Sequence, residues 1–246
     1  MAEPRRIPGH GPGCVDGDYI DVKRPLSQLI YHRIQDGQGS PRVISLHRHN
    51  QYGRDVKDYA LAAAPGSDAR VIGLESYKGV YVGRSIVGYT WFIGPFDRPS
   101  PLFFGDALAE IERFLWDEID RQESDRPELP FLVGVEQGAI MAIATAAAVP
   151  DLLSGVIAID GMLPIVPGWE PPLAPLADLP VLLIDPPDMP DRGQRVLAGA
   201  ALVDTLRSWG GDVSRVVAPS SPVPAGLMAK WMGDRSPRHL ATTDAK

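Results

Sequence analysis

Cysteine is almost absent from the sequence, with Cys14 alone among 246 residues. A single thiol cannot form a disulfide within the chain, so we expect an apolar core to hold the fold and a reducing, cytoplasmic location. Long apolar runs are missing too, because the longest, residues 139–149, is too short to span a bilayer. The basic pair Arg5-Arg6 is not followed by an apolar segment, so we expect no signal peptide.

Runs of like charge are also missing, and the formal net charge is −7. Surfaces that bind nucleic acid or anionic membranes need clustered basic side chains, so we expect neither partner. The glycine spacing of a dinucleotide site is absent around residues 134–138, and no metal-ligand spacing is recognisable. We therefore expect a small-molecule substrate, no cofactor and no metal. The oligomeric state stays open, a homodimer included.

The composition that remains, 44% hydrophobic and 22% charged, is typical of a globular protein. Glycine and proline are frequent in residues 1–18, which we expect to form a flexible arm. Residues 19–235 are expected to form one domain, and residues 236–246 a C-terminal tail.

Apolar strand patterns alternate with helical patterns from residue 42 onward, which predicts an α/β fold with a mostly parallel sheet covered on both faces. The expected strands are 42–46, 69–74, 131–135, 153–159, 181–184 and 213–217, and the expected helices are 56–64, 106–121, one that follows residue 136, 194–209 and 225–232. Two short strands, 19–22 and 29–31, are expected to form an antiparallel edge. Glycines and prolines punctuate residues 76–101, which predicts a long loop packed by its aromatic side chains.

The segment Gly134-Val135-Glu136-Gln137-Gly138 follows an apolar strand and precedes a helix of small residues. Paired glycines are common in ordinary strand-to-helix turns, where they allow close packing. The same strand, turn and helix are what a nucleophile elbow requires. At the carboxyl edge of a parallel sheet, Glu136 is the candidate functional residue.

Several segments in order along the chain resemble one family. They are Leu46-His47, Gly88-Tyr89-Thr90-Trp91-Phe92, the segment 134–138, Leu153-Ser154-Gly155-Val156-Ile157-Ala158 with Gly161, and Pro180-Val181-Leu182-Leu183-Ile184. Together they resemble the phospholipase/carboxylesterase branch of the α/β-hydrolase superfamily, with its acyl-protein thioesterases and dienelactone hydrolase-like relatives. The resemblance covers roughly residues 40–235. It implies the α/β-hydrolase fold, a mostly parallel central sheet with helices on both faces and antiparallel N-terminal strands.

The resemblance also implies a Ser-His-Asp site, from which this sequence departs. Glu136 stands at the position of the nucleophilic serine, and Ser221, or Ser220 one position earlier, stands at that of the histidine. The family's acid falls near Asp188, and Arg48 replaces a glycine of the oxyanion loop. Because a serine hydrolase needs the imidazole to move the serine proton, ordinary esterase activity is not expected.

Three hypotheses follow. In the first, Glu136 is a general acid or base beside His47, His49 and Arg48, and backbone N–H groups at Gln137 and near Arg48 polarise a carbonyl. Such a site fits elimination, isomerisation, cyclisation or decarboxylation of a small carbonyl compound. The second is a catalytically inactive pseudo-hydrolase that binds a ligand or partner, with Glu136 paired to Arg48. The third is a hydrolase with Glu136 as covalent nucleophile and His47 or His49 activating water.

The surrounding residues allow more than one interpretation. His47 fits a backbone-anchoring role as well as a catalytic one, and His49 could simply be a surface residue. Four side chains are expected to line a hydrophobic substrate pocket, with core packing as the alternative: Tyr89, Trp91, Leu163 and Trp169. Asp160, Asp185 and Asp188 could join Glu136 in an acidic rim for a divalent cation, but their spacing does not support a metal site.

Overall fold

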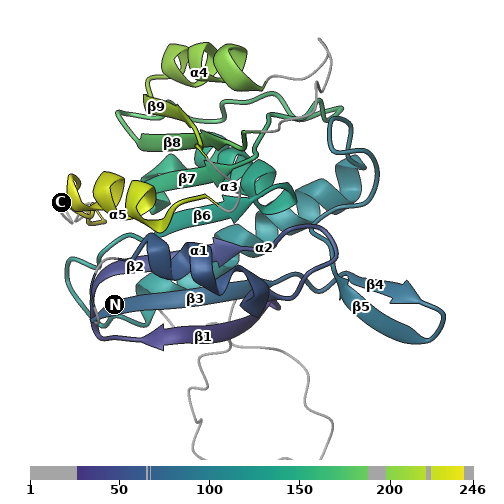
Figure 1. The fold of residues 1–246 in the computed structure, drawn as a ribbon, viewed down its shortest axis with the longest axis horizontal. Coiled ribbons are helices and arrows are strands. Elements are labelled where there is room, and N and C mark those ends of the chain that lie inside the picture. The colour runs from purple at the N-terminus through teal and green to yellow at the C-terminus, as the bar shows by residue number, and fades with distance from the viewer. Residues whose placement is uncertain (1–26, 65, 67, 188–197, 220–222, 241–246) are drawn as a thin grey trace, which may run out of the picture.

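The computed structural model describes residues 27–64, 66, 68–187, 198–219 and 223–240. Within them, seven strands form one sheet in the order β1-β3-β2-β6-β7-β8-β9 (Figure 1). The strands are β1 (Ile30–Asp36), β2 (Gly39–Leu46), β3 (Ala69–Glu75), β6 (Phe131–Val135), β7 (Gly155–Ile159), β8 (Pro180–Asp185) and β9 (Asp212–Val217). β1 is antiparallel to β3, and every other neighbouring pair is parallel. The expected mostly parallel sheet with an antiparallel N-terminal strand is confirmed.

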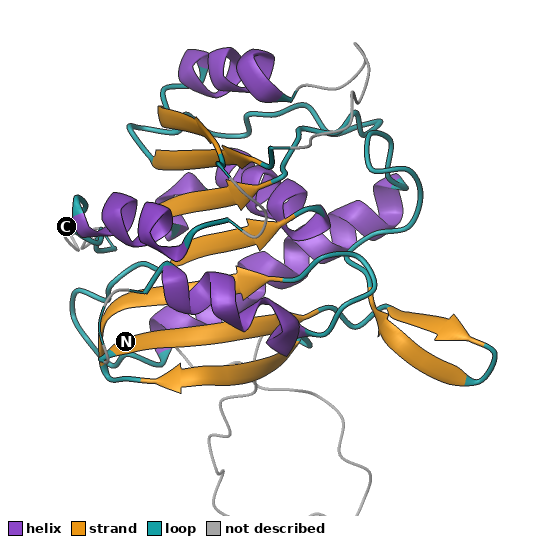
Figure 2. Cartoon of the chain, viewed as in Figure 1, coloured by secondary structure: helices purple, strands orange, loops and turns teal. Residues whose placement is uncertain are grey.

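Helices cover both faces of this sheet (Figure 2). They are α1 (Lys57–Ala62), α2 (Pro101–Asp120), α3 (Gln137–Ala148), α4 (Gly199–Ser208) and α5 (Ala225–Gly233), with short 3-10 turns η1 (Gly53–Val56) and η2 (Pro150–Leu152). Successive side chains of a strand point to opposite faces. In β7, Val156 and Ala158 therefore join the core under α2, α3 and α4, and Ile157 and Ile159 join the core under α1 and α5.

Helix α3 is buried along nearly its whole length, from Gln137 to Ala147. A helix that is apolar on all sides can be stable only inside a core. Its alanines and Gly138 let it lie close to β6 and β7 on one side and to α2 on the other. This close packing fixes the position of the turn that precedes the helix.

The prediction of a loop over residues 76–101 is wrong for part of that range. β4 (Gly79–Val82) and β5 (Ser85–Tyr89) form an antiparallel hairpin that projects from the body (Figure 1). Its two-residue turn begins at Gly83, whose φ of +62° suits a tight hairpin. Tyr81 and Val82 near the tip are 63% and 68% exposed and only the base of the hairpin is partly buried, so its strands show no clear apolar alternation.

Some expectations lie outside the described residues: the arm 1–18 with Cys14, the strand 19–22 and the first part of the helix expected over 194–209. At the other end, the Leu129 N–H donates to the Arg238 carbonyl at 2.8 Å, and the Leu240 N–H donates to the Pro127 carbonyl at 3.0 Å. These bonds extend the packed part of the chain beyond residue 235, and the division into arm, domain and tail stays a prediction. No helix among the described residues has the length and apolar character needed to cross a membrane.

Candidate active site

Glu136 occupies the tight turn between β6 and α3. Its backbone has φ +54° and ψ −110°, a strained conformation that costs a residue with a Cβ about 1–3 kcal/mol. Glycines on either side make room for the turn: a Cβ on Gly134 would lie 2.3 Å from the Gly138 carbonyl oxygen, and one on Gly138 would lie 2.2 Å from that of Leu46. The geometry is that of a nucleophile elbow with a glutamate at its tip.

The Glu136 carboxylate is half-buried and held at one oxygen. Oε2 accepts a hydrogen bond from the backbone N–H of His49 at 3.2 Å. The residue directly precedes α3, whose first N–H groups, that of Gln137 included, have no partner within the helix and carry partial positive charge. Among the described residues Oε1 has no hydrogen-bond partner, so it is the oxygen available to a ligand.

His47 is locked to the backbone. Its Nδ1 lies 2.6 Å from the Arg48 carbonyl, and its Nε2 lies 3.1 Å from the Ser76 nitrogen. Because the first partner only accepts and the second only donates, the ring is a neutral imidazole with its proton on Nδ1. Its ring stacks on Trp91 at 4.8 Å, and burial lowers the pKa of His47 to about 4. These contacts favour the anchoring interpretation over the expected acid/base role, since neither nitrogen is available to a substrate.

His49 is exposed and differs from His47 in having one ring nitrogen available. Its Nδ1 lies 3.0 Å from Thr90 Oγ1. The single hydroxyl proton of Thr90 is directed to the Phe92 carbonyl at 2.8 Å or to Gln137 Oε1 at 2.9 Å, both of which only accept. Thr90 therefore accepts from Nδ1–H of His49, which leaves the lone pair on Nε2.

The Gln137 side chain ties this region together. Its Oε1 accepts from the Trp91 N–H at 2.7 Å, and its Nε2 donates to the Phe92 carbonyl at 3.0 Å. The elbow helix is thereby bonded to the segment 90–92, and through Thr90 to His49.

Arg48 does not meet Glu136 in the described structure. Its Nη2 donates to Tyr59 Oη at 3.2 Å, and its guanidinium lies 5.8 Å from the centroid of the Tyr59 ring on α1. The expected pairing with Glu136 is therefore corrected: the backbone N–H of His49 holds the carboxylate instead.

The four side chains expected to line a substrate pocket differ in burial. Trp91 is fully buried and donates from Nε1 to the His47 carbonyl at 2.9 Å, and Leu163 is 4% exposed. Both belong to the core, as the alternative interpretation held, and the expectation that they line a pocket is corrected. Tyr89 and Trp169 are half-buried, Tyr89 with its ring edge-on to Tyr52 and Trp169 against Phe104 at 5.1 Å.

Asp160 and Asp185 are the described aspartates of the acidic rim expected beside Glu136. Asp185 is buried, and its Oδ2 accepts from Arg215 Nε at 2.6 Å. Asp160 follows β7 with a φ of +58°. Among the described residues, no three His, Cys, Asp or Glu side chains gather closely enough to hold a cation. Asp188 and Ser221 lie outside the described residues.

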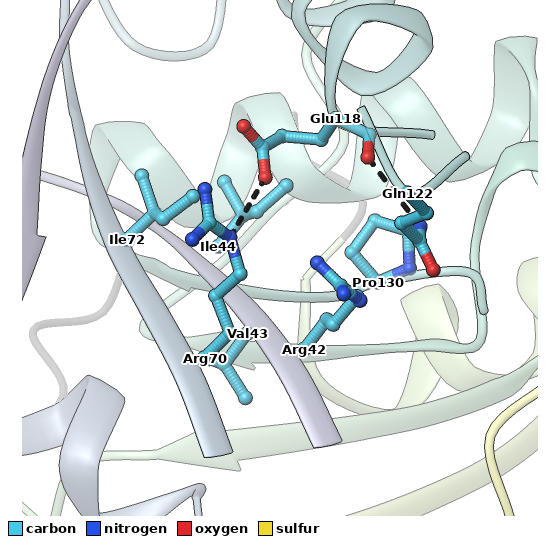
Figure 3. Close-up of a pocket in the computed structure, with 8 residues that line it drawn as sticks. All are labelled: Arg42, Val43, Ile44, Arg70, Ile72, Glu118, Gln122 and Pro130. Carbon is cyan, nitrogen blue, oxygen red and sulfur yellow. Dashed lines mark hydrogen bonds and ion pairs between the residues drawn. The ribbon is translucent and has the colours of Figure 1, made fainter. Parts of the chain in front are cut away.

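The hollow drawn in Figure 3 lies toward the amino ends of β2 and β3. It is lined by Arg42, Val43, Ile44, Arg70, Ile72, Glu118, Gln122 and Pro130. Arg42 lies four residues before Leu46, and four strand residues span about 13 Å. Ligands of such sheets bind at the carboxyl ends of the strands, so this hollow is separate from the candidate site.

Known structures resemble this chain closely in fold. A carboxylesterase from Mesorhizobium loti superposes with a TM-score of 0.65 at 18% identity, over 80% of this chain and 90% of that chain. The Bacillus cereus carboxylesterase gives 0.62 at 17% identity, over 83% and 91%. A phospholipase/carboxylesterase from Dyadobacter fermentans gives 0.56 at 18% identity, over 85% and 95%. The chain therefore has the α/β-hydrolase fold, as the sequence resemblance implies.

A sequence relative resembles part of the chain. The "Putative esterase NocK" of Nocardia uniformis subsp. tsuyamanensis is 29% identical over 151 residues, which are 60% of this chain and 39% of that protein. The chain thus spans well under half the length of this relative. No protein-family model matches the chain.

Two features of the site were missed in the sequence. The bond between the His49 N–H and Glu136 joins residues 87 positions apart, and the Gln137 clamp joins α3 to a segment about 46 positions earlier. A polar Gln at the start of an otherwise apolar helix was the only local signal of the clamp.

Proposed function

We propose that this chain is an α/β-hydrolase-fold enzyme in which Glu136 acts as a general base or acid on a small, partly hydrophobic carbonyl compound. The chemistry is non-hydrolytic: isomerisation, elimination, cyclisation or decarboxylation. The fold is shared with carboxylesterases, and the glutamate at the elbow sets the chemistry apart from theirs.

The observation that carries the proposal is the state of Glu136. A strained backbone presents its side chain at the carboxyl edge of the sheet, one oxygen is held by the His49 N–H, and the other has no partner in the described residues. A residue that had lost its role could relax this strain through replacement by glycine, so the strained glutamate favours a function.

The proposed reaction begins with the substrate carbonyl at the Gln137 N–H. Oε1 of Glu136 takes a proton from the carbon next to the carbonyl, and the C–H electron pair moves to the carbonyl oxygen, which the N–H stabilises. Return of the proton to another carbon completes an isomerisation. Departure of a leaving group from the neighbouring carbon with its bonding electron pair completes an elimination, and the protonated Glu136 can give its proton to that group.

Deuterium exchange tests this step without knowledge of the natural substrate. In D2O, the protein is expected to exchange the protons next to the carbonyl of small aromatic ketones such as 4-phenyl-2-butanone. Glu136→Gln should slow this exchange about 10²–10⁴-fold, the usual contribution of a general base. NMR of the ketone measures the rate.

Glu112→Gln on α2 is the matched control, since it removes the same charge away from the elbow. It should exchange at the wild-type rate. Wild-type exchange in Glu136→Gln would refute the assignment of the base.

A ligand-binding pseudo-hydrolase is the second candidate, favoured by the backbone-locked His47, although Arg48 binds Tyr59 and does not pair with Glu136 as that hypothesis expected. It predicts that the ketones bind without exchange or turnover. The third hypothesis, a covalent ester on Glu136 with His49 activating water, predicts a mass adduct on Glu136 after incubation with an ester or epoxide.

A further inference from the structure

The loop that leaves the carboxyl edge of the sheet after β7 meets the loop that follows the β4–β5 hairpin beside the start of α2. The Ile165 N–H donates to the Asp97 carbonyl at 2.9 Å and ties the loop after β7 to the loop after β5. Between them is an open hollow of about 430 Å³, lined by Arg98, Pro99, Ser100, Pro101, Ile165 and Pro167. This volume lies within the range of small-molecule sites.

Exposed apolar side chains belong to the segments that line the hollow, and one of them, Ile165, lines it directly. Ile93, Leu102 and Ile165 are 51%, 67% and 55% exposed. The Ser100 N–H donates to the Ile93 carbonyl at 2.9 Å, so Ile93 lies next to Ser100, which lines the hollow. Clustered exposed apolar side chains beside a hollow mark a surface that a ligand covers.

The hollow also offers positive charge. Within the described residues, the exposed Arg98 guanidinium has no ion-pair or hydrogen-bond partner, and the Ser100 side chain does not cap α2. The first N–H groups of this 20-residue helix, those of Leu102 and Phe103, have no partner within the helix. An arginine beside a helix N-terminus is suited to a carboxylate.

A series of contacts leads from Glu136 toward the loop that lines the hollow. The Phe96 ring lies 6.2 Å from the ring of His49, whose N–H binds the Glu136 carboxylate. Arg98 follows Phe96 by two residues, so their Cα atoms are at most about 7.6 Å apart. Phe96 therefore packs against His49 from the same loop that carries Arg98 to the hollow.

We propose that this hollow is the subsite for the acidic group of the substrate, and that the substrate is a small amphipathic carboxylic acid. Its carboxylate binds Arg98 and the start of α2, and its apolar body lies on Ile93, Leu102 and Ile165. Its carbonyl reaches Glu136 past Phe96. This inference rests on the proposed function, whose substrate class it specifies.

A binding experiment tests the subsite separately from catalysis. The probes are 4-phenylbutyrate and its neutral amide, titrated by ligand-observed NMR. Wild-type protein is expected to bind the acid about tenfold more tightly than the amide, as a charge-assisted bond would provide. Arg98→Gln should bring the two affinities within about twofold.

Arg84→Gln, at the turn of the β4–β5 hairpin, removes the same charge from another exposed position and should keep the full preference for the acid. Ile165→Ser should weaken both probes to a similar extent, since it shortens the apolar contact they share. Equal binding of acid and amide, binding of neither, or an Arg84→Gln effect equal to that of Arg98→Gln would overturn the subsite.

Glu136→Gln separates the two proposals. It should abolish deuterium exchange and leave the preference for the acid intact. Loss of the acid preference in Arg98→Gln together with unchanged exchange in Glu136→Gln would support the subsite and refute the base. Deuterium exchange that depends on Glu136, in a protein that does not prefer the acid to the amide, would support the base and refute the subsite.

Discussion

Glu136 and His47 follow the neighbouring strands β6 and β2, but their side chains differ in burial and in hydrogen bonding. Glu136 keeps a half-buried carboxylate with one oxygen bonded to a backbone N–H. His47 is buried with both ring nitrogens bonded to backbone groups. The first leaves one carboxylate oxygen available to a ligand, while the second holds the ends of β2 and β3 together.

The buried imidazole predicts a loss of stability in acid. Because burial lowers the pKa of His47 from 6.5 to about 4, the unfolded chain binds more protons than the folded one between these values. The stability that the neutral ring contributes is full above pH 6.5 and falls, by roughly 3 kcal/mol in all, as the pH drops to 4. Urea unfolding from pH 7 to pH 4 measures it.

The His47→Gln variant separates the effect of His47 on the pH dependence of stability from the effect of the carboxylates. Its free energy of unfolding is expected to be lower at pH 7 and to vary less with pH between 6.5 and 4. A variant whose pH dependence matches the wild type would show that His47 does not carry the effect.

At the scale of elements, the elbow brings together the backbones of β6, α3 and β2. Gly138 is the second residue of α3 and lies directly against the Leu46 and His47 carbonyls at the end of β2. The closeness of this contact brings the His49 N–H within reach of Glu136. Helix packing and the site geometry thus depend on the same missing side chain.

Gly138→Ala is expected to destabilise the fold by about 1–3 kcal/mol, because the added Cβ would lie 2.2 Å from the Leu46 carbonyl oxygen and one backbone must shift. Gly226→Ala is the control, since Gly226 is also the second residue of its helix, α5, and its Cβ would meet nothing within 4 Å. It should be neutral or stabilise by up to about 1 kcal/mol. Chemical denaturation compares the two, and equal effects would contradict the steric explanation.

At the scale of the whole molecule, two cores share one sheet. Alternate residues of the same strands enter the core under α2, α3 and α4 and the core under α1 and α5. Loss of either core removes the support of strands that build the other, which indicates one cooperative unit.

Met228→Ala on α5 tests this coupling. Met228 is fully buried, so its truncation should cost about 2–5 kcal/mol. The transitions followed by tryptophan fluorescence and by far-ultraviolet circular dichroism should shift together. Two separate transitions would show that the faces unfold independently.

The larger part of the fold was predictable because its signals are local. Strands such as β6 and β7 are short apolar runs, and α2 repeats its apolar residues at helical spacing, so order and type followed from the chain itself. The β4–β5 hairpin was missed because its strands show no clear apolar alternation. The interpretation of Arg48 failed because its partner Tyr59 lies on α1, eleven positions along the chain.

The sequence by itself determined the alternation of strands and helices, the glycines that permit the elbow and the glutamate at its tip, because these depend on neighbouring residues and on backbone sterics. Only the tertiary structure decided which histidine is locked and which is open, where Arg48 binds, and that Phe96 packs against His49. Most of those contacts join residues eleven or more positions apart, and packing brings them together in ways that no local pattern encodes.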